Sequence, residues 1–375
     1  MKILFVITKS DLGGAQVFVL NLACTLKKLG CEVEVAAGEG DFLFQELEKN
    51  KIEFHYLKSL KRDFSVFNAL YFVTELHGLL KVKNYDIIHL NSSNTLIGSL
   101  SRYLLVKKPK TVFTFHGLSF IDHNFSPNLF IKALAKFYFR IFLRTIDKLI
   151  FECKMNYDEL KSTGMINNAE IIYNGIDEND LKFLSREDVR KHFKNLSGID
   201  IENSFIIGST GRLAHQKNYE FLINNFFRIK EKIPKIKVVI IGDGPDRLSF
   251  EKKIKELGLE TEFILLGELV NSHQYLKGFD LFTLTSRYEG VSISLIEALY
   301  ASIPILATNV GGNPEVLGYS DHQLFELNDI DGYLKNLSEI RNNKDVCIKY
   351  NQERKKNFSL NEMAVNYKKL FDSLL

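Results

Sequence analysis

Short runs of β-branched and apolar residues alternate with longer stretches of helical periodicity from one end of the chain to the other. This alternation is typical of parallel α/β units. The predicted helices include Ala15–Lys28, which ends at Gly30, and Leu96–Leu105. The strands predicted in the first half are Ile3–Ile7, Glu32–Ala36, Glu53–Leu57, Ile87–Leu90, Thr111–Phe115, Lys148–Phe151 and Glu170–Tyr173.

The pattern starts again in the second half of the chain. A turn-forming cluster at Asn174–Asp177, followed by a polar stretch, separates the two halves. A chain of 375 residues is also long for one domain. We therefore expect two similar doubly wound, Rossmann-like α/β domains, at residues 1–175 and 176–359. The strands predicted in the second half are Phe205–Thr210, Lys237–Ile241, Glu262–Leu266, Leu281–Leu284 and Pro304–Ala307.

The last segment, residues 360–375, repeats apolar residues at helical spacing and predicts a docking helix. Our hypothesis is that this helix packs back on the N-terminal domain, and the sequence leaves packing on the C-terminal domain as the alternative. The residues that carry the periodicity are Leu360, Met363, Ala364, Tyr367, Leu370 and Phe371.

Charge and composition restrict the partners and the compartment. The formal net charge of +3 is too small to indicate a nucleic-acid partner. The four cysteines show no metal-binding spacing and fit a reducing compartment. The first apolar run is too short for a signal peptide, and no stretch approaches the ~18 apolar residues of a membrane span. We expect a cytoplasmic protein whose contact with a membrane is restricted to its surface.

Ligands of open parallel sheets bind beyond the carboxyl ends of the strands, and several unusual loops are predicted there. Gly13 and Gly14 follow the first strand and start a helix, where backbone N–H groups favour an anion. The alternative for this loop is a flexible turn. Arg212 and Lys217 follow the strand at Phe205–Thr210 and suit a diphosphate. The alternative for this pair is two solvated cations, with Asn218 as a helix N-cap.

Two carboxylates follow the strand at Leu281–Leu284. Glu289 lies in the loop, and Glu297 is expected in the first turn of the next helix. They could bind hydroxyl groups while backbone N–H groups at the helix start bind phosphate. A capping box formed by Ser294 and Glu297 is the structural alternative, and it leaves Glu289 and Gly290 unexplained.

Two further loops stand out. Gly311–Glu315 joins a strand to a helix that is expected to begin with proline at its first position. His116 ends the strand at Thr111–Phe115, although a lone histidine is more often structural than catalytic.

Taken together, these segments resemble the family 4 (group 1) retaining glycosyltransferases of GT-B fold. The resemblance covers nearly the whole chain, in order and at the expected spacing. Its most specific part is the segment YEGVSISLIEAL, in which seven residues separate Glu289 from Glu297. The other matching segments are GGAQ at residues 13–16, NGID at 174–177, GRLAHQKN at 211–218, IIGDGP at 240–245 and ATNVGGNPEV at 307–316.

The resemblance implies a donor site in a cleft that the two domains face. Arg212 and Lys217 would bind the donor diphosphate, Glu297 the ribose hydroxyls and Glu289 the transferred sugar. His116 would lie by the 6-position of the sugar and is often treated as catalytic in this family. Backbone groups would complete the donor site at Gly13, Gly14, Gly267, Gly290, Val291, Ser292 and Ser294.

The resemblance also implies retention of anomeric configuration, electrostatic catalysis without a metal, and no other cofactor. The sequence offers no separate general base, and the departing phosphate is a candidate for that role. Asp329 and Asp331 mimic the metal-binding DxD of another transferase class, but they begin a polar helical stretch far from the other motifs. Gln16 stands where related sequences often carry glutamate, which leaves the details of the acceptor side in doubt.

The segment Phe130–Leu149 carries cations at four-residue steps among aromatic residues. It suggests contact with an anionic membrane, although steps of four wind around a helix, and a solvated helix side is the alternative. Our hypothesis is a lipid-linked sugar or a growing surface polysaccharide, such as lipopolysaccharide, as acceptor. The enzyme would then be peripheral to the inner membrane face.

Three rival interpretations remain. A nicotinamide-dependent dehydrogenase is poorly supported, because Arg247 replaces the third glycine of the only near-fingerprint, at Gly242–Gly244. A nucleotide-sugar epimerase or hydrolase of the same architecture is a second rival, and a non-catalytic sugar-nucleotide-binding protein is a third. The sequence favours UDP over GDP as the base and leaves the sugar, the acceptor, the linkage and the oligomeric state open.

Overall fold

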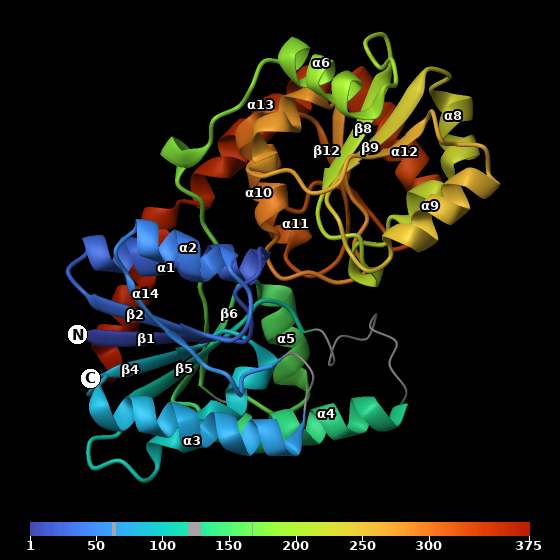
Figure 1. The fold of residues 1–375 in the computed structure, drawn as a ribbon. Helices are drawn as coiled ribbons and strands as arrows, with labels where there is room; N and C mark the ends of the chain where they lie inside the picture. Colours follow the sequence, from blue (N-terminus) through green and yellow to red (C-terminus); the bar gives the residue numbers. More distant parts are fainter. Residues whose placement is uncertain (62–64, 119–128, 167) are drawn as a thin grey trace. The chain divides into compact units, whose positions relative to one another are not determined.

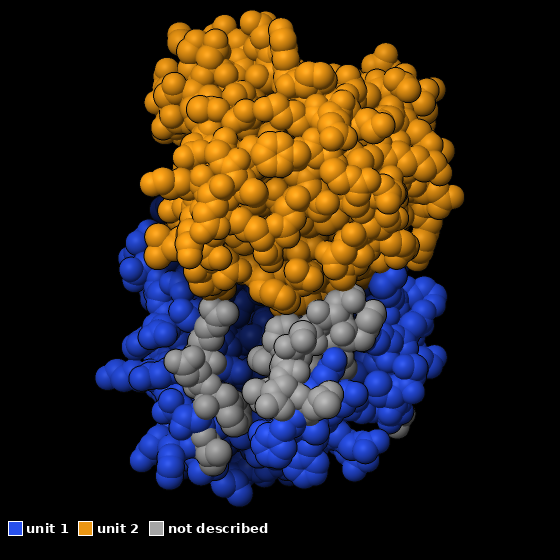
Figure 2. Space-filling model, turned by 90° about the vertical axis from the view of Figure 1, so that its right-hand side faces the viewer, with its two compact units in different colours: residues 1–175, 359–375 blue, residues 176–358 orange. Residues whose placement is uncertain are grey.

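The computed structural model describes residues 1–61, 65–118, 129–166 and 168–375. The chain, drawn as a ribbon in Figure 1, divides into two compact units, which Figure 2 shows in different colours. The N-terminal unit contains Met1–Gly175 together with Ser359–Leu375, and the C-terminal unit contains Ile176–Phe358. Among the residues described, no helix combines the length and the apolar character needed to cross a membrane.

The N-terminal unit is built on a parallel sheet with strand order β3-β2-β1-β4-β5-β6-β7. Its central strands are almost entirely buried, which explains their continuous apolar sequences. The strands are β1 (Lys2–Ile7), β2 (Glu32–Ala37), β3 (Glu53–Tyr56), β4 (Ile87–Leu90), β5 (Lys110–Phe115), β6 (Lys148–Phe151) and β7 (Ala169–Ile171).

Helices cover both faces of this sheet (Figure 1). One face packs against α1 (Gly14–Lys28), α2 (Phe42–Lys49) and α14 (Leu360–Leu374). The other face packs against α3 (Val66–Val82), the 3₁₀ helices η1 (Ser93–Arg102) and η2 (Leu143–Thr145), α4 (Leu129–Phe142) and α5 (Lys154–Ser162).

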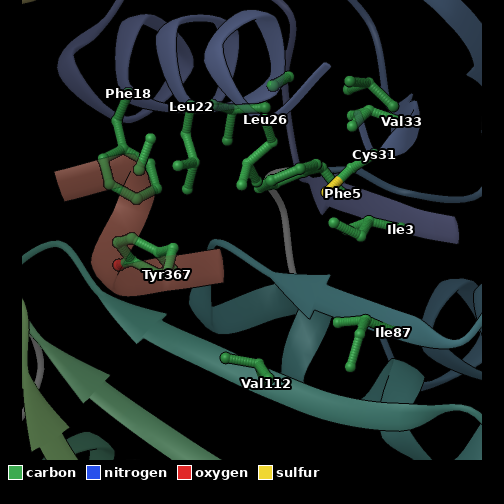
Figure 3. Packing of buried hydrophobic residues seen from close by; sticks show 14 of the residues in the cluster. Ile3, Phe5, Phe18, Leu22, Leu26, Cys31, Val33, Ile87, Val112 and Tyr367 are labelled. Carbon is green, nitrogen blue, oxygen red and sulfur yellow. The ribbon is translucent and has the colours of Figure 1, made fainter. Parts of the chain in front are cut away.

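The C-terminal helix α14 belongs to the N-terminal unit, and the alternative of packing on the C-terminal domain is wrong. Tyr367 of α14 is fully buried, with its ring 5.8 Å from that of Phe18 on α1. Figure 3 shows Phe18, Leu22 and Leu26 pointing from α1 into this layer. The apolar spacing along the last segment is therefore explained by burial against the core of the first unit.

The C-terminal unit repeats the architecture with strand order β10-β9-β8-β11-β12-β13, all parallel. The two-residue strand β13 was not predicted, because a pair of residues shows no periodicity. The strands are β8 (Phe205–Thr210), β9 (Ile236–Ile241), β10 (Phe263–Leu265), β11 (Leu281–Leu284), β12 (Ile305–Thr308) and β13 (Leu324–Phe325).

The helices of this unit are connected in sequence with its strands. They are η3 (Glu178–Asp180), α6 (Arg186–Ser197), η4 (His215–Lys217), α7 (Glu220–Asn224), α8 (Phe226–Lys232), α9 (Arg247–Glu256), η5 (Ser272–Gly278), α10 (Ile293–Ala301), α11 (Asn313–Val316), α12 (Ile330–Asn342), α13 (Lys344–Arg354) and η6 (Lys355–Asn357).

Two predicted helical segments differ from the observed elements. The helix expected at Leu96–Leu105 is the 3₁₀ helix η1, which begins at Ser93 because Ser92 and Thr95 form a reciprocal capping box. The segment Phe130–Leu149 is not one helix, since α4 ends at Phe142 and Lys148 lies in β6, where it pairs with Glu170 at 3.2 Å.

Candidate functional site

Glycines hold together the loops that follow β8, β9 and β10. The N–H of Gly242 donates to the carbonyl of Gly267 at 2.8 Å, and the N–H of Gly211 donates to Ile241 at 3.0 Å. Gly242 has a φ of +148°, and a Cβ there would lie 2.1 Å from the carbonyl oxygen of Gly211. Only glycine allows this approach. The loop that carries Arg212 and Lys217 is therefore fixed at the carboxyl end of the sheet, with Gly267 bonded to the neighbouring loop.

Lys217 and Glu289, from separate loops, form an ion pair in the C-terminal unit. The Nζ of Lys217 lies 2.6 Å from Oε1 of Glu289, and both side chains are largely buried. The hydroxyl of Ser286 donates to the same carboxylate oxygen at 2.6 Å. The amide of Gln216 donates to the carbonyl of Tyr288 at 3.1 Å. Two predicted site residues, 72 positions apart, are thus brought together.

The loop after β12 supports the loop that carries Glu289. Gly311 has a φ of +52°, and a Cβ there would lie 2.0 Å from the carbonyl oxygen of Glu289. The N–H of Gly312 donates to the carbonyl of Gly290 at 2.9 Å. The glycine pair that stood out in the sequence therefore fixes the backbone on both sides of the peptide that joins Glu289 to Gly290.

Helix α10 starts directly after this loop, and its N-cap is Ser292. The alternative of a capping box between Ser294 and Glu297 is wrong, because Ser294 is the second helical residue. Glu297 is the fifth, so it lies beyond the first turn in which it was expected. The hydroxyls of Ser292 and Ser294 are 3.0 Å apart. The N–H groups of the first turn of α10 are the ones that the sequence analysis proposed as phosphate ligands. A helix N-terminus favours anions, so the start of α10 suits that role.

Glu297 is a carboxyl group in an environment that disfavours charge. Burial raises the pKa of Glu297 to about 8. The nearest ring nitrogen of His273 is 3.9 Å away, and burial also lowers the pKa of that imidazole. A carboxyl group that is 16% exposed and does not cap the helix is a candidate for binding ligand hydroxyls.

The remaining cation of the predicted diphosphate site, Arg212, lies on the same loop as Lys217 and is exposed. Asn218 is not a helix N-cap, because it adopts a left-handed conformation with a φ of +53° at the end of η4. The alternative in which it capped the next helix is wrong.

His116 of the N-terminal unit lies in a cluster of buried polar side chains that sequence reasoning missed. Its Nδ1 lies 2.6 Å from Oε1 of Glu152, and its Nε2 lies 3.3 Å from Oδ1 of Asn91. The amide of Asn174 donates to the same oxygen of Glu152 at 3.2 Å. Asn91, His116 and Glu152 directly follow three neighbouring strands, β4, β5 and β6. Glu152 was missed because a single acidic residue after a strand belongs to no recognisable motif. Its contact with His116 becomes evident only once β5 and β6 are known to be neighbours in the sheet.

Gly13 and Gly14 start α1 in a loop that is internally bonded. The hydroxyl of Ser10, which is fully buried, lies 2.7 Å from the carbonyl of Gly40. The amide of Gln16 donates to the carbonyl of Lys9 at 3.0 Å. A Cβ on Gly14 would meet nothing within 4 Å, so packing inside the unit does not require glycine there. Close approach of a ligand to the backbone is a separate reason for it.

The aspartates that mimic a DxD motif have structural partners. Asp329 is the N-cap of α12 and accepts a hydrogen bond from the N–H of Gly332 at 3.0 Å, and Asp331 pairs with Arg228. In the described part of the chain, one group has the geometry to ligate a metal, Glu34, Glu53 and His55. The ammonium groups of Lys2 and Lys83 contact the carboxylates of Glu34 and Glu53, respectively. They neutralise the negative charge that would otherwise attract a metal cation.

The chain matches two families. Residues 12–180 match the family described as Glycosyltransferase Family 4, and residues 191–357 match the one described as Glycosyl transferases group 1. The UDP-Gal:alpha-D-GlcNAc-diphosphoundecaprenol alpha-1,3-galactosyltransferase of Escherichia coli is 30% identical over 305 residues, which cover 78% of this chain and 76% of that protein. An uncharacterized glycosyltransferase of Methanocaldococcus jannaschii is 27% identical, and the match covers 72% of this chain and 64% of the length of that protein.

Solved structures share the fold. The crystal structure of Anabaena Alr3699/HepE in complex with UDP and glucose has a TM-score of 0.82 and 20% sequence identity, with complete coverage of both chains. The prediction of two Rossmann-like α/β domains in a GT-B fold is confirmed by this likeness and by the two parallel sheets.

The raised pKa of Glu297 predicts a pH-dependent effect on stability. The folded state holds this proton more tightly than the unfolded state, so ionisation destabilises the protein as pH rises from 4.5 towards about 8. The slope is at most about 1.4 kcal/mol per pH unit. In Glu297→Gln the charge cannot form, so the variant should gain free energy of unfolding relative to the parent as pH rises. Urea unfolding across this pH range measures the difference.

Glu256→Gln, on the exposed surface of α9, is the matched control, and it should show no such trend. If the free energies of unfolding of Glu297→Gln and the parent change in parallel with pH, the raised pKa of Glu297 is contradicted.

Proposed function

This chain belongs to the group 1, family 4 glycosyltransferases, and we propose that it moves a sugar from a UDP-sugar to a lipid-linked sugar acceptor with retention of configuration. The observation that carries the proposal is the buried pair of Lys217 and Glu289 beside the N-terminus of α10. A cation, a carboxylate and the N–H groups of a helix N-terminus together suit a sugar diphosphate.

The C-terminal unit would hold the nucleotide. Arg212 and Lys217 would bind the diphosphate together with the N–H groups of Gly290–Ser294. Glu297 would accept hydrogen bonds from the ribose, and the loop at Gly267 would lie beside the base. The glycines at residues 13–14 are the proposed contribution of the N-terminal unit. UDP is favoured because the name of the Escherichia coli relative specifies UDP-Gal and the Anabaena protein was solved with UDP.

Binding would redistribute the charges of the site. Lys217 would direct its N–H groups to the phosphate oxygens, and Glu289 would be released to bind hydroxyls of the transferred sugar. The bond from the anomeric carbon to the diphosphate oxygen breaks, and a bond to the acceptor oxygen forms on the same face of the sugar. The acceptor proton passes to the departing phosphate oxygen. Fixed cations and helix N–H groups stabilise the developing charge without a metal or another cofactor.

The N-terminal unit would contribute His116 to the reaction. Glu152 would then act as a positioning residue, because it holds one ring nitrogen and is itself held by Asn174. An imidazole whose orientation is fixed by a buried carboxylate loses less freedom when the reacting groups assemble.

A lipid-linked acceptor is favoured by the name of the Escherichia coli relative, whose acceptor is a sugar on diphosphoundecaprenol. Such an acceptor is anchored in a membrane, so the enzyme would work at the inner membrane face in the synthesis of a surface polysaccharide or glycolipid.

Thermal unfolding with a panel of UDP- and GDP-sugars tests the donor assignment. A ligand at about 100 times its Kd should stabilise the protein by about 2.7 kcal/mol, and UDP-sugars should do so at lower concentration than GDP-sugars.

Arg212→Ala should weaken UDP binding by at least about tenfold, since a charge-assisted hydrogen bond is worth roughly 1.5–3 kcal/mol.

Lys252→Ala, which removes a cation on α9 in the same unit, is the control and should bind UDP like the parent. Equal UDP affinity for Arg212→Ala and the control would contradict the assignment of Arg212 as a ligand of the diphosphate. Release of free sugar or an epimer, with no transfer to any lipid-linked acceptor, would favour a nucleotide-sugar hydrolase or epimerase instead of a transferase.

The role of Glu152 is tested by Glu152→Gln. The amide cannot hold the imidazole as the carboxylate does, so we expect kcat for donor turnover to fall at least about tenfold while KM for the donor stays unchanged. Glu152→Asp should restore part of kcat. A loss of thermal stability with kcat retained would instead indicate a purely structural carboxylate.

A further inference from the structure

Helix α4 of the N-terminal unit exposes a stripe of large apolar side chains to solvent. Phe130, Leu134, Phe137 and Ile141 are 74%, 59%, 62% and 43% exposed. Steps of four, three and four residues place them within about 60° of one another around a helix with 3.6 residues per turn. We refer to these four residues as the α4 stripe.

The α4 stripe is separate from the face that fastens α4 to the core. Phe139 and Leu143 are buried, and the ring of Phe139 stacks on that of Phe115. The hydroxyl of Tyr138 donates to the carbonyl of Ser93 at 3.1 Å. An ordinary surface helix needs one apolar face, and α4 already buries one. The second face needs another explanation, because clustered exposed apolar residues mark interaction sites.

Cations lie beside the α4 stripe. Lys136 and Arg140 are exposed, and helical geometry places them on the same flank, about 80–120° from Phe130. No acidic residue occurs between Leu129 and Phe142. A step of four residues shifts Arg140 by only about 40° from Lys136 around the helix, and the drift does not continue to Arg144 and Lys148, because α4 ends at Phe142.

Helix α3 adds apolar surface on the same side of the sheet. Phe67, Leu70 and Tyr71 are each more than half exposed. The buried sides of α3 and α4 pack into the same core cluster, so both helices cover the same face of the sheet, below it in Figure 1.

We propose that the α4 stripe docks on the surface of an anionic lipid bilayer. Its aromatic and aliphatic side chains would enter the boundary between headgroups and acyl chains, while Lys136 and Arg140 would meet anionic headgroups. The chemistry favours lipid over a second copy of this chain, since a symmetric interface would bring two cationic helices together. Docking on a bilayer rests on the proposed function in one respect, because an enzyme with a lipid-linked acceptor has to reach a membrane.

Vesicle flotation tests the proposal with the full chain. We expect the protein to bind vesicles of phosphatidylcholine that contain about one-third phosphatidylglycerol, and to bind pure phosphatidylcholine at least tenfold more weakly. The double variant Leu134→Ser, Phe137→Ser should lose at least tenfold in binding to the anionic vesicles. Lys136→Glu with Arg140→Glu should abolish the preference for anionic lipid and the sensitivity to salt.

Leu248→Ser with Lys252→Glu changes an exposed leucine and a lysine on α9 of the other unit, and it should bind vesicles like the parent. All these side chains are exposed, so thermal unfolding should show folded variants. No binding of the parent, or equal binding by the α4 variants and the control, would overturn the proposal. A dimer that Phe137→Ser dissociates would overturn it in favour of a second copy. Stabilisation by UDP-sugars is measured separately and should be unchanged in every variant.

Discussion

The ion pair between Lys217 and Glu289 is the interaction on which the proposed donor site of the C-terminal unit depends. It joins the loop after β8 to the loop after β11, two strands that are neighbours in the sheet. Each charge is costly to bury alone, and each is tolerated because the other lies 2.6 Å away. The pair holds both groups in a mostly buried position. Under the proposed function, a diphosphate and a sugar would take the places of these internal partners.

Backbone geometry makes this arrangement specific. Gly242 and Gly311 have positive φ angles and no room for a Cβ, and each brings one loop against the next. The peptides that carry Arg212 and Glu289 are therefore held by neighbouring backbone instead of by flexible side chains. Burial raises the pKa of Glu297 to about 8, so this carboxyl disfavours charge at neutral pH, and under the proposed function it would bind ligand hydroxyls. In the N-terminal unit, Glu152 holds His116 in a comparable way.

The fold was largely readable from periodicity, because buried parallel strands are continuous apolar runs and most helices lie between them. Donor binding remains a proposal, but the loops proposed for it were readable, because glycines and paired charges at strand ends are unusual. The cap of α10 was not, since Ser292 and Ser294 are equally good N-cap residues in sequence and tertiary packing chooses between them. Glu152 and Asn91 were missed because their partner His116 is distant in sequence and adjacent only through strand pairing. The exposed stripe of α4 was hidden as well, because the sequence does not say which of two apolar faces is buried.

The most direct test of the central claim is a crystal structure of the protein with UDP bound. The account predicts the diphosphate within hydrogen-bonding distance of Arg212, Lys217 and the first N–H groups of α10, with the ribose at Glu297. It also predicts that Lys217 turns from Glu289 towards phosphate. A complex in which Lys217 stays paired with Glu289 and the diphosphate lies away from both cations would contradict it.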